Sequence, residues 1–248
     1  MVAVNFESWL IGFIEGEGSF SSNRGRYPVF SLAQKYRQVM DITRELFGVG
    51  TVYHAPSTDT WKYSVYGKAC WPVRLLCDGD LQLRKKVAQF DKWIQLKWPQ
   101  NVSSKQYSFQ FNFEDWLIGF IEAEGSFTRL GNGIYPEFSV AQKDEKEVIE
   151  RIQRFFGCGT VKETGNKVAW QLRITGRGDC QKVRAFCEGR LQLEKRQIQF
   201  EAWKKLNWID VLEVRRKDKR FAQFAVAHPD GTFFYGVDAS GKKTVLNV

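Results

Sequence analysis

Several features are scarce in this chain of 248 residues, and each absence argues against a class of protein. It contains two histidines, which disfavours metallohydrolases built on histidine ligands. It has no apolar run near the roughly 18 residues that a membrane span requires. The longest apolar stretch, Trp9–Ile14, ends at Glu15 and follows no basic segment, so it does not resemble a secretory signal peptide.

Cysteines are also few, and their spacing does not suit a disulfide framework. Cys70 and Cys77, like Cys180 and Cys187, are seven residues apart in helix-like stretches. Such a pair is about 10 Å apart along a helix axis, too far for a disulfide or for one zinc ion. With Cys158 as a fifth, we expect buried, reduced thiols in an intracellular, reducing compartment, whether organellar or cytoplasmic.

What the chain does have is positive charge and apolar packing material. Its 37 Lys and Arg residues exceed 28 Asp and Glu, for a net charge of +9. The 43 % apolar and 26 % charged residues are ordinary for a globular protein. A basic protein favours a polyanionic partner, nucleic acid first and an anionic membrane surface second.

The sequence contains an internal duplication. The matching blocks, in order, are 5–20 with 112–127, 27–35 with 135–143, 47–52 with 156–161, and 81–90 with 191–200. The offset rises only from 107 to 110, which corresponds to a few single-residue insertions in the second copy. Four blocks and the pair of Trp61 with Trp170, all in the same order, are not a coincidence, so we expect two copies of one structural unit.

Each copy is predicted to run helix, strands, helix, strands, helices. Asn5 and Asn112 are good N-caps for the first helices, and Gly18 and Gly125 occupy the C′ position that would end them. We therefore divide the chain into a first half, a linker, a second half and an unmatched extension with appended strands, at 1–97, 98–110, 111–207 and 208–248.

Small residues four apart mark one face of each first helix. These are Gly12 and Gly16 in the first copy, and Gly119 and Ala123 in the second. Because a helical glycine costs roughly 1 kcal/mol relative to alanine, we expect it to allow close packing of the two helices about a pseudo-two-fold axis.

Packing of these helices would gather acidic side chains at their C-terminal ends. The acids are Glu15, Glu17, Glu122 and Glu124. Helix dipoles disfavour anions at that end, so four carboxylates there indicate divalent cations.

The segments LIGFIEGEG (10–18) and LIGFIEAEG (117–125) resemble the signature motifs of the LAGLIDADG homing endonucleases, of the single-chain, two-motif type. The resemblance covers about residue 5 to about residue 207. It implies an α+β fold: a pseudo-two-fold tandem duplication of an α-β-β-α-β-β-α unit with saddle-like antiparallel sheets, in a monomer.

The resemblance also implies a set of catalytic residues. The last acid of each motif, here Glu17 and Glu124, would bind two or three Mg²⁺ ions, with Ca²⁺ as a non-catalytic substitute, and the preceding Gly16 and Ala123 join this metal set. Both acids are Glu where the name of the motif has Asp. The supporting residues fall on Gln34, Gln142, Lys85 and Lys195, or on Lys86 and Arg196 if the alignment slips by one.

The function implied is cleavage of both strands of a long, asymmetric DNA target, with short 3′ overhangs, in support of intron mobility. Metals held by carboxylates would supply the nucleophile and stabilise the leaving oxygen. One alternative is an RNA maturase that binds its host intron RNA on the same scaffold. Another is a DNA-binding regulator without cleavage, which the acids in both copies disfavour.

Strand alternation assigns DNA contacts to the polar face of each sheet. Outward positions in the first copy are Ser21, Asn23, Ser31, Tyr53, Lys62 and Ser64; in the second they are Thr128, Asn132, Ser139, Lys162, Thr164, Gln171 and Arg173. These types can read base edges in the major groove. Phosphate contacts are assigned to Arg24, Arg26, Lys35, Arg129 and Lys143.

Overall fold

The computed structural model describes residues 4–96, 98, 109–130, 135–165 and 169–206, together with three short strands between 224 and 246. The first half contains α1 (Phe6–Glu17), β1 (Gly18–Asn23), β2 (Tyr27–Gln34), α2 (Gln38–Phe47), β3 (Thr51–Ala55), β4 (Thr60–Tyr66), α3 (Trp71–Cys77) and α4 (Arg84–Ile94), with 3₁₀ turns at Pro56–Thr58 and Gly67–Cys70. The second contains α5 (Phe113–Glu124), β5 (Gly125–Leu130), β6 (Tyr135–Gln142), α6 (Lys146–Phe156), β7 (Thr160–Glu163), β8 (Trp170–Thr175), α7 (Arg177–Cys187) and α8 (Glu194–Lys204).

The order of elements confirms the predicted α+β duplication and refines its end. Each half closes with two helices, where the unit α-β-β-α-β-β-α had one. The chain turns between them at Gly79 in the first half and at Gly189 in the second, whose φ angles are 84° and 69°. A left-handed backbone favours glycine, which explains why the helix stops there.

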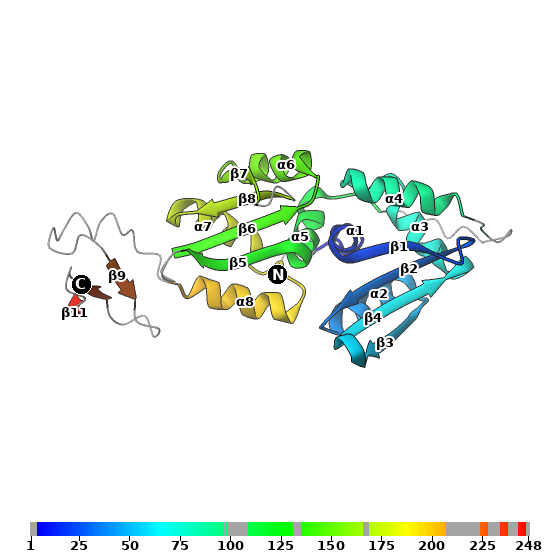
Figure 1. Ribbon diagram of the computed structural model, residues 1–248, viewed down its shortest axis with the longest axis horizontal. Coiled ribbons are helices and arrows are strands. Elements are labelled where there is room, and N and C mark those ends of the chain that lie inside the picture. The colour runs from blue at the N-terminus through cyan, green and yellow to red at the C-terminus, as the bar shows by residue number, and fades with distance from the viewer. Residues whose placement is uncertain are drawn as a thin grey trace.

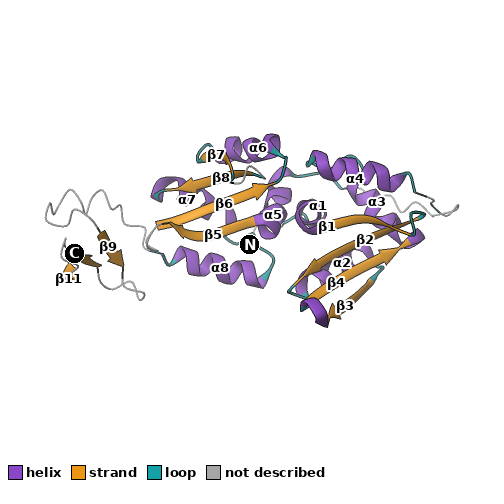
Figure 2. Ribbon diagram, viewed as in Figure 1, coloured by secondary structure: helices purple, strands orange, loops and turns teal. Residues whose placement is uncertain are grey.

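Each half is built around a four-stranded antiparallel sheet, in the order β1-β2-β4-β3 and β5-β6-β8-β7 (Figures 1 and 2). One face of each sheet packs on helices through aromatic side chains. In the first half Phe20 lies 5.4 Å from Phe30 and 5.2 Å from Trp93 of α4, measured between ring centroids. The opposite face of each sheet carries the polar residues.

The helices α1 and α5 lie between the two sheets and join the halves (Figure 1). Both begin at the predicted caps: the side chain of Asn5 accepts a hydrogen bond from the backbone of Ser8, and that of Asn112 accepts from Glu114 and Asp115. Trp9 and Trp116 are fully buried in this interface. A single core therefore runs through both halves.

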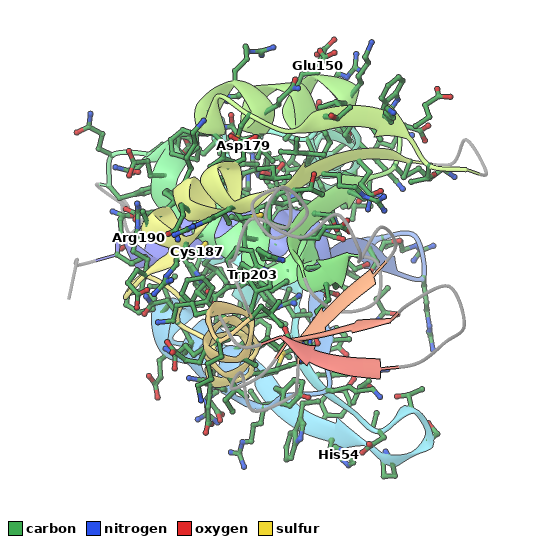
Figure 3. All side chains as sticks on the ribbon, turned by 90° about the vertical axis from the view of Figure 1, so that its left-hand side faces the viewer. His54, Glu150, Asp179, Cys187, Arg190 and Trp203 are labelled. Atoms are coloured by element: carbon green, nitrogen blue, oxygen red, sulfur yellow. The ribbon has the colours of Figure 1, made fainter. Side chains whose placement is uncertain are left out.

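The outer edges of the two sheets point away from each other. Figure 3 shows His54, on β3, at the bottom of the view and Glu150, on α6, at the top. All five cysteines are free, and burial raises the pKa of Cys70 and Cys180 to about 12. In the described part of the chain, no helix is long and apolar enough to cross a membrane.

The segments outside the two halves are described only in part. Of the assigned linker, the structure describes residues 98, 109 and 110. The extension contributes β9 (Phe224–Ala227), β10 (Phe234–Val237) and β11 (Lys243–Leu246), which pair antiparallel in the order β11-β10-β9. Strands were predicted there.

Candidate active site

The backbones of α1 and α5 approach each other closely at the glycine stripes. A Cβ atom built on Gly12 would lie 2.0 Å from the carbonyl oxygen of Trp116, and one built on Gly119 would lie 1.9 Å from that of Trp9. No side chain fits at either position. The predicted packing of the two helices is confirmed, and it fixes their C-terminal ends next to each other.

Both helices end at the expected acid, but the glycine that follows does not act as a left-handed cap. Gly18 has φ −76° and Gly125 has φ −71°, and each begins a strand. A Cβ on Gly18 would lie 2.6 Å from the carbonyl oxygen of Ile14. The predicted C′ role is wrong: these glycines let the strand leave tightly against the last helical turn.

Glu17 and Glu124 meet at the shared end of the helices. The carboxylate of Glu124 lies beside α1, since a Cβ built on Gly16 would be 3.3 Å from its Oε1 atom. Partial burial raises the pKa of both acids, and the nearby charge of Glu17 raises the pKa of Glu124 further. A divalent cation between them would relieve this repulsion.

A glutamine at the end of the second strand holds each of these acids. The amide nitrogen of Gln34 donates to Glu17 Oε1 over 2.5 Å, and that of Gln142 lies 3.5 Å from Glu124 Oε1. The amide oxygen of Gln34 accepts in turn from the backbone of Lys35. The structure thus brings both predicted glutamines to the predicted acids.

Glu15 and Glu122 do not belong to this cluster, which corrects the expectation of four carboxylates at one metal site. Both are buried. Glu15 accepts hydrogen bonds from the backbones of Gln82 and Leu83 and from the indole of Trp116, 2.6 Å away in the other half. Burial raises its pKa to about 7, against the effect of these donors.

Glu122 repeats this arrangement in the opposite direction. It accepts from the indole of Trp9 and from the backbones of Gln192 and Leu193. Burial raises its pKa to about 7 as well. Each inner acid therefore ties its own motif helix to the other half and to the start of a closing helix, α4 or α8.

The cations beside the outer acids are Lys86 and Arg196. The Nζ atom of Lys86 donates to the carbonyl oxygen of Gly18, and Arg196 donates to the carbonyl oxygens of Glu122 and Ala123 over 2.7 and 3.1 Å. Burial lowers the pKa of both cations, while the surrounding acids oppose that shift. The carbonyl of Ala123, assigned to the metal set, thus already accepts from Arg196.

Among the described residues, no hydrogen bond joins Lys85 or Lys195, the first assignment, to the outer acids, although each lines a cavity beside them. Lys85 is exposed, and its backbone nitrogen donates to Glu145 over 2.7 Å. Lys195 is half-buried with its Nζ 4.5 Å from the centre of the Tyr36 ring, although its charge still acts on Glu17. Lys86 and Arg196, one residue later in each helix, are the cations that bond to the ends of the motif helices.

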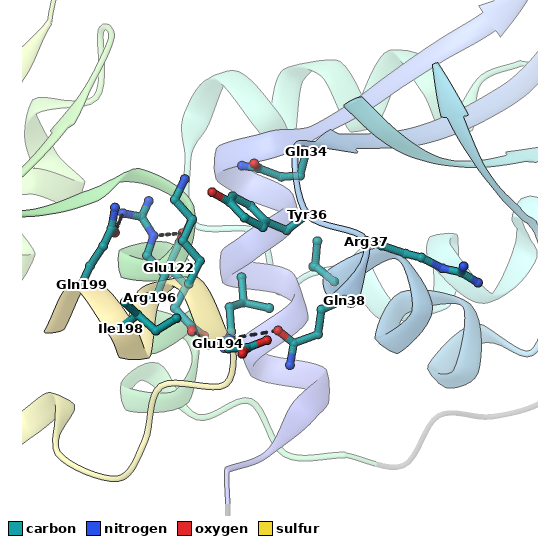
Figure 4. A pocket seen from close by; sticks show the side chains of 12 residues that line it. Gln34, Tyr36, Arg37, Gln38, Glu122, Glu194, Arg196, Ile198 and Gln199 are labelled. Atoms are coloured by element: carbon teal, nitrogen blue, oxygen red, sulfur yellow. Dashed lines mark hydrogen bonds between the residues drawn. The ribbon is translucent and has the colours of Figure 1, made fainter. Parts of the chain in front are cut away.

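The two sides of the cluster differ in shape. On one side a cavity of about 580 Å³ lies between the β2–α2 connection and the start of α8, with Gln34, Tyr36 and Arg196 in its wall (Figure 4). On the other side the matching cavity, beside Lys86 and Gln142, measures about 110 Å³.

The two cavities also differ in the side chain that caps the adjacent closing helix. The carboxylate of Glu145, buried, accepts from the backbones of Arg84 and Lys85 and closes the start of α4. At the start of α8, the exposed side chain of Gln38 accepts from the backbone of Glu194 (Figure 4) and donates to the carbonyl oxygen of Gln192.

The residues assigned to base contacts do share one face of each sheet. In the register, Ser31 faces Ser64, Tyr53 faces Lys62, and Ser139 faces Arg173, all opposite to the core side chains. Ser64 and Ser139 are nevertheless only 5 % and 7 % exposed, since they are short side chains on central strands. Their placement agrees with the parity prediction, but their accessibility does not.

The other assigned residues lie around these central positions. A hollow of about 330 Å³ on the second sheet is lined by residues that include Lys162, Thr164, Gln171 and Arg173. Those that are exposed on or beside the sheets are Ser21, Asn23, Arg24, Arg26, Lys35, Thr128, Arg129 and Lys143. Asn132 lies outside the described residues.

Sequence reasoning missed one acid on this surface. Glu137 lies on the outward face of β6, among the positions assigned to DNA contacts, and its Oε2 atom is 3.5 Å from Arg173 Nε. The signal was present in the aligned blocks, where YPE replaces the YPV of the first copy.

Comparison with known proteins relates the chain to intron-encoded and LAGLIDADG endonucleases. Residues 117–207 match the family model described as LAGLIDADG endonuclease. A probable intron-encoded endonuclease 4 of Neurospora crassa is 33 % identical over 132 residues, which is 50 % of this chain and 24 % of the relative. A probable intron-encoded endonuclease, Cox1-I1b, of Schizosaccharomyces pombe is 29 % identical over 198 residues, 61 % of this chain and 49 % of the relative.

The chain thus spans between a quarter and a half of these relatives. Among solved structures, the LAGLIDADG homing endonuclease I-GzeII in complex with its DNA target superposes with a TM-score of 0.64 at 16 % identity, covering 89 % of this chain and 94 % of the other. I-SmaMI bound to uncleaved DNA in the presence of calcium ions gives 0.56 at 15 % identity, covering 86 % and 92 %. At such identities the likeness concerns the fold.

Proposed function

We propose that this chain, which belongs to the LAGLIDADG family, is a site-specific endonuclease that hydrolyses both strands of duplex DNA with divalent metal ions. The observation that carries this proposal is the pair Glu17 and Glu124. Each is the last residue of a twinned helix, each is held by a glutamine, and each has a cation nearby. A purely structural helix end has no use for this repeated set.

The residues present fit a metal that is shared with substrate. No group of three or more His, Cys, Asp or Glu side chains suited to a metal occurs among the described residues. Mg²⁺ commonly binds through one or two carboxylates together with phosphate oxygens, which two acids under a DNA backbone would provide. Glu17 and Glu124 would hold it, with the carbonyl oxygen of Gly16 as a further ligand, whereas the carbonyl oxygen of Ala123 already accepts from Arg196. The bound metal would supply Lewis-acid stabilisation and an activated water.

The protein groups around the acids would orient the carboxylates and a water molecule, and would neutralise negative charge on a phosphate. Gln34 and Gln142 fix the carboxylates and can position a water through the same amide. Lys86 and Arg196, rather than Lys85 and Lys195, are then the cations that offset charge developing on a phosphate. Two such centres, one for each strand, would leave short 3′ overhangs.

Recognition would use the two outward sheet faces. Ser31 and Lys62 in the first half and Gln171 and Arg173 in the second lie where base edges of successive major-groove segments would pass. Because the faces differ at most positions, the target would be long and asymmetric. Intron mobility is the role that such an activity would serve, inside a reducing compartment that suits five free cysteines.

The test is selection of a target from a randomised duplex library. The protein is incubated with the library and Mg²⁺, and the cut ends are sequenced. Recovery of one long, asymmetric site with a fixed stagger supports the proposal, and cleavage must stop in EDTA. Binding of structured RNA in preference to every duplex would instead favour the maturase, which no comparison supports.

A further inference from the structure

The outward faces of the two sheets differ in charge at one pair of matching positions. In the first half, the central strands carry Val29 and Ser64 there. The same positions in the second half carry Glu137 and Arg173. Because the fold of the first half accommodates an apolar residue and a serine, an acid and an arginine are not required by the backbone.

On this outward face the side chain of Glu137 is nearly buried, whereas that of Arg173 is exposed. The side chain of Glu137 is 9 % exposed and that of Arg173 is 52 % exposed. In the register Ser139 faces Arg173 and Glu137 faces Thr175, so the two side chains are diagonal neighbours on β6 and β8. Their closest atoms, Glu137 Oε2 and Arg173 Nε, are 3.5 Å apart.

This ion pair leaves two unmet requirements. The Oε2 atom of Glu137 is buried and accepts no hydrogen bond among the described residues. Burying a carboxylate is unfavourable unless it is paired and hydrogen-bonded. The guanidinium of Arg173, in turn, has its Nε edge toward Glu137 and no other partner in the described part of the chain.

An acid at this place also has a consequence for DNA. A carboxylate repels phosphates, so it weakens any duplex whose backbone lies over it. Such an acid would be tolerated beneath base edges rather than beneath phosphates. Glu137 and Arg173 lie on the central strands β6 and β8 of the order β5-β6-β8-β7, away from the edges of the sheet. In the binding mode of the proposed function, the pair would therefore face base edges and not the phosphate rim.

We propose that Glu137 is a specificity-determining positioning residue, which holds Arg173 by its Nε edge and directs its two terminal nitrogens to a guanine in the second half-site. Guanine presents O6 and N7 to the major groove, and a bidentate arginine is the contact that fits them. A fixed guanidinium discriminates better because fewer rotamers remain to satisfy another base. The first half, with Val29 and Ser64, has no equivalent.

This inference rests on the proposed function, and its test begins with the target selected by the parent protein. Cleavage of every single-base variant of that target is then compared for the parent, Glu137→Gln and Arg173→Ala. Both substitutions should lower discrimination at the same G·C pair by about tenfold or more. The other positions, the first half-site and the melting temperature should stay unchanged.

A double-substitution cycle separates positioning from direct contact. If Glu137 acts through Arg173, Glu137→Gln adds nothing once Arg173→Ala is present. A second double variant, Glu137→Val with Arg173→Ser, installs the residues of the first half. The first sheet already accommodates these residues at the matching positions, Val29 and Ser64. This double variant should fold and should lose the same guanine preference.

Three results would overturn the inference. One is an unchanged profile for Glu137→Gln beside an altered one for Arg173→Ala. Another is a uniform loss over both half-sites, which indicates a structural role. The third is a parent that selects no duplex at all, which is seen before any variant is made and refutes the proposed function itself.

Discussion

The two halves of the chain agree where they touch each other and differ where they face outward. Along α1 and α5, Gly12 has its counterpart in Gly119, and the bond from the indole of Trp9 to Glu122 mirrors that from Trp116 to Glu15. On the sheet faces the agreement ends. A residue in the interface between α1 and α5 cannot be substituted without affecting its partner, because each contact uses one residue from each copy.

The closing helices show the same lesson on a smaller scale. Glu145 of the second half caps α4 of the first with two backbone hydrogen bonds, and Gln38 of the first half caps α8 of the second with one. The cavities beside the outer acids also differ, at about 110 and 580 Å³. The two centres would share their acids and differ in their surroundings.

The largest effect is expected from the outer acids. Glu17→Gln and Glu124→Gln should each abolish double-strand cleavage and leave the target affinity within about tenfold, or 1.4 kcal/mol. Removal of Mg²⁺ with EDTA should do the same. Two measurements test this: linearisation of a plasmid that carries the selected target, and the affinity for that target in Ca²⁺. The exposed Glu45→Gln serves as control, and normal linearisation by either acid variant would refute the site.

The next largest effect tests the symmetry of the helix interface. Gly12→Ala and Gly119→Ala each place a methyl group about 2 Å from a carbonyl oxygen of the partner helix, so each should lower the free energy of unfolding by at least ~3 kcal/mol. Gly178→Ala, with no atom within 4 Å of the added carbon, should be nearly neutral. Chemical denaturation measures all three. Equal stability of the three variants would mean that the motif helices do not meet at these glycines.

A smaller effect should distinguish the two helix caps. Glu145→Ala leaves the backbone nitrogens of Arg84 and Lys85 without their charged acceptor, and should cost about 2 kcal/mol of stability. Gln38→Ala removes an exposed cap and should cost under ~1 kcal/mol. Denaturation midpoints at equal slope compare them. A larger loss for Gln38→Ala would reverse the assignment of the stronger cap.

Much of this arrangement was predictable from the sequence, because the duplication fixes the elements and the motif fixes two acids. The parity of the strands also placed Lys62 and Arg173 on the correct face. Contacts between the copies were not predictable. Nothing in the spacing tells that Glu15 turns to Trp116 while Glu17 stays at the helix end, since both acids lie in the same helix. That choice depends on which donors the other half presents.

The smallest effect concerns phosphate contacts, which should not distinguish the halves at all. Arg24 lies in the turn after β1 and Lys143 follows β6, so each stands at the edge of one outward face. Arg24→Gln and Lys143→Gln each remove one charge, and each should flatten the dependence of log Kd on log salt by about one unit. Glutamine is shorter than arginine or lysine but stays polar without charge, and at position 24 it tolerates the φ of 53° no worse than arginine does. Lys182→Gln, on the helix α7 that covers the opposite face of the second sheet, is the matched control and should leave the slope unchanged.

Because phosphates carry no sequence information, the loss of affinity should be equal for every duplex, whereas variants of the sheet faces should change discrimination at individual base pairs. If only one of the two variants, Arg24→Gln or Lys143→Gln, changes the salt slope, then the phosphate contacts, like the sheet faces, have diverged between the copies.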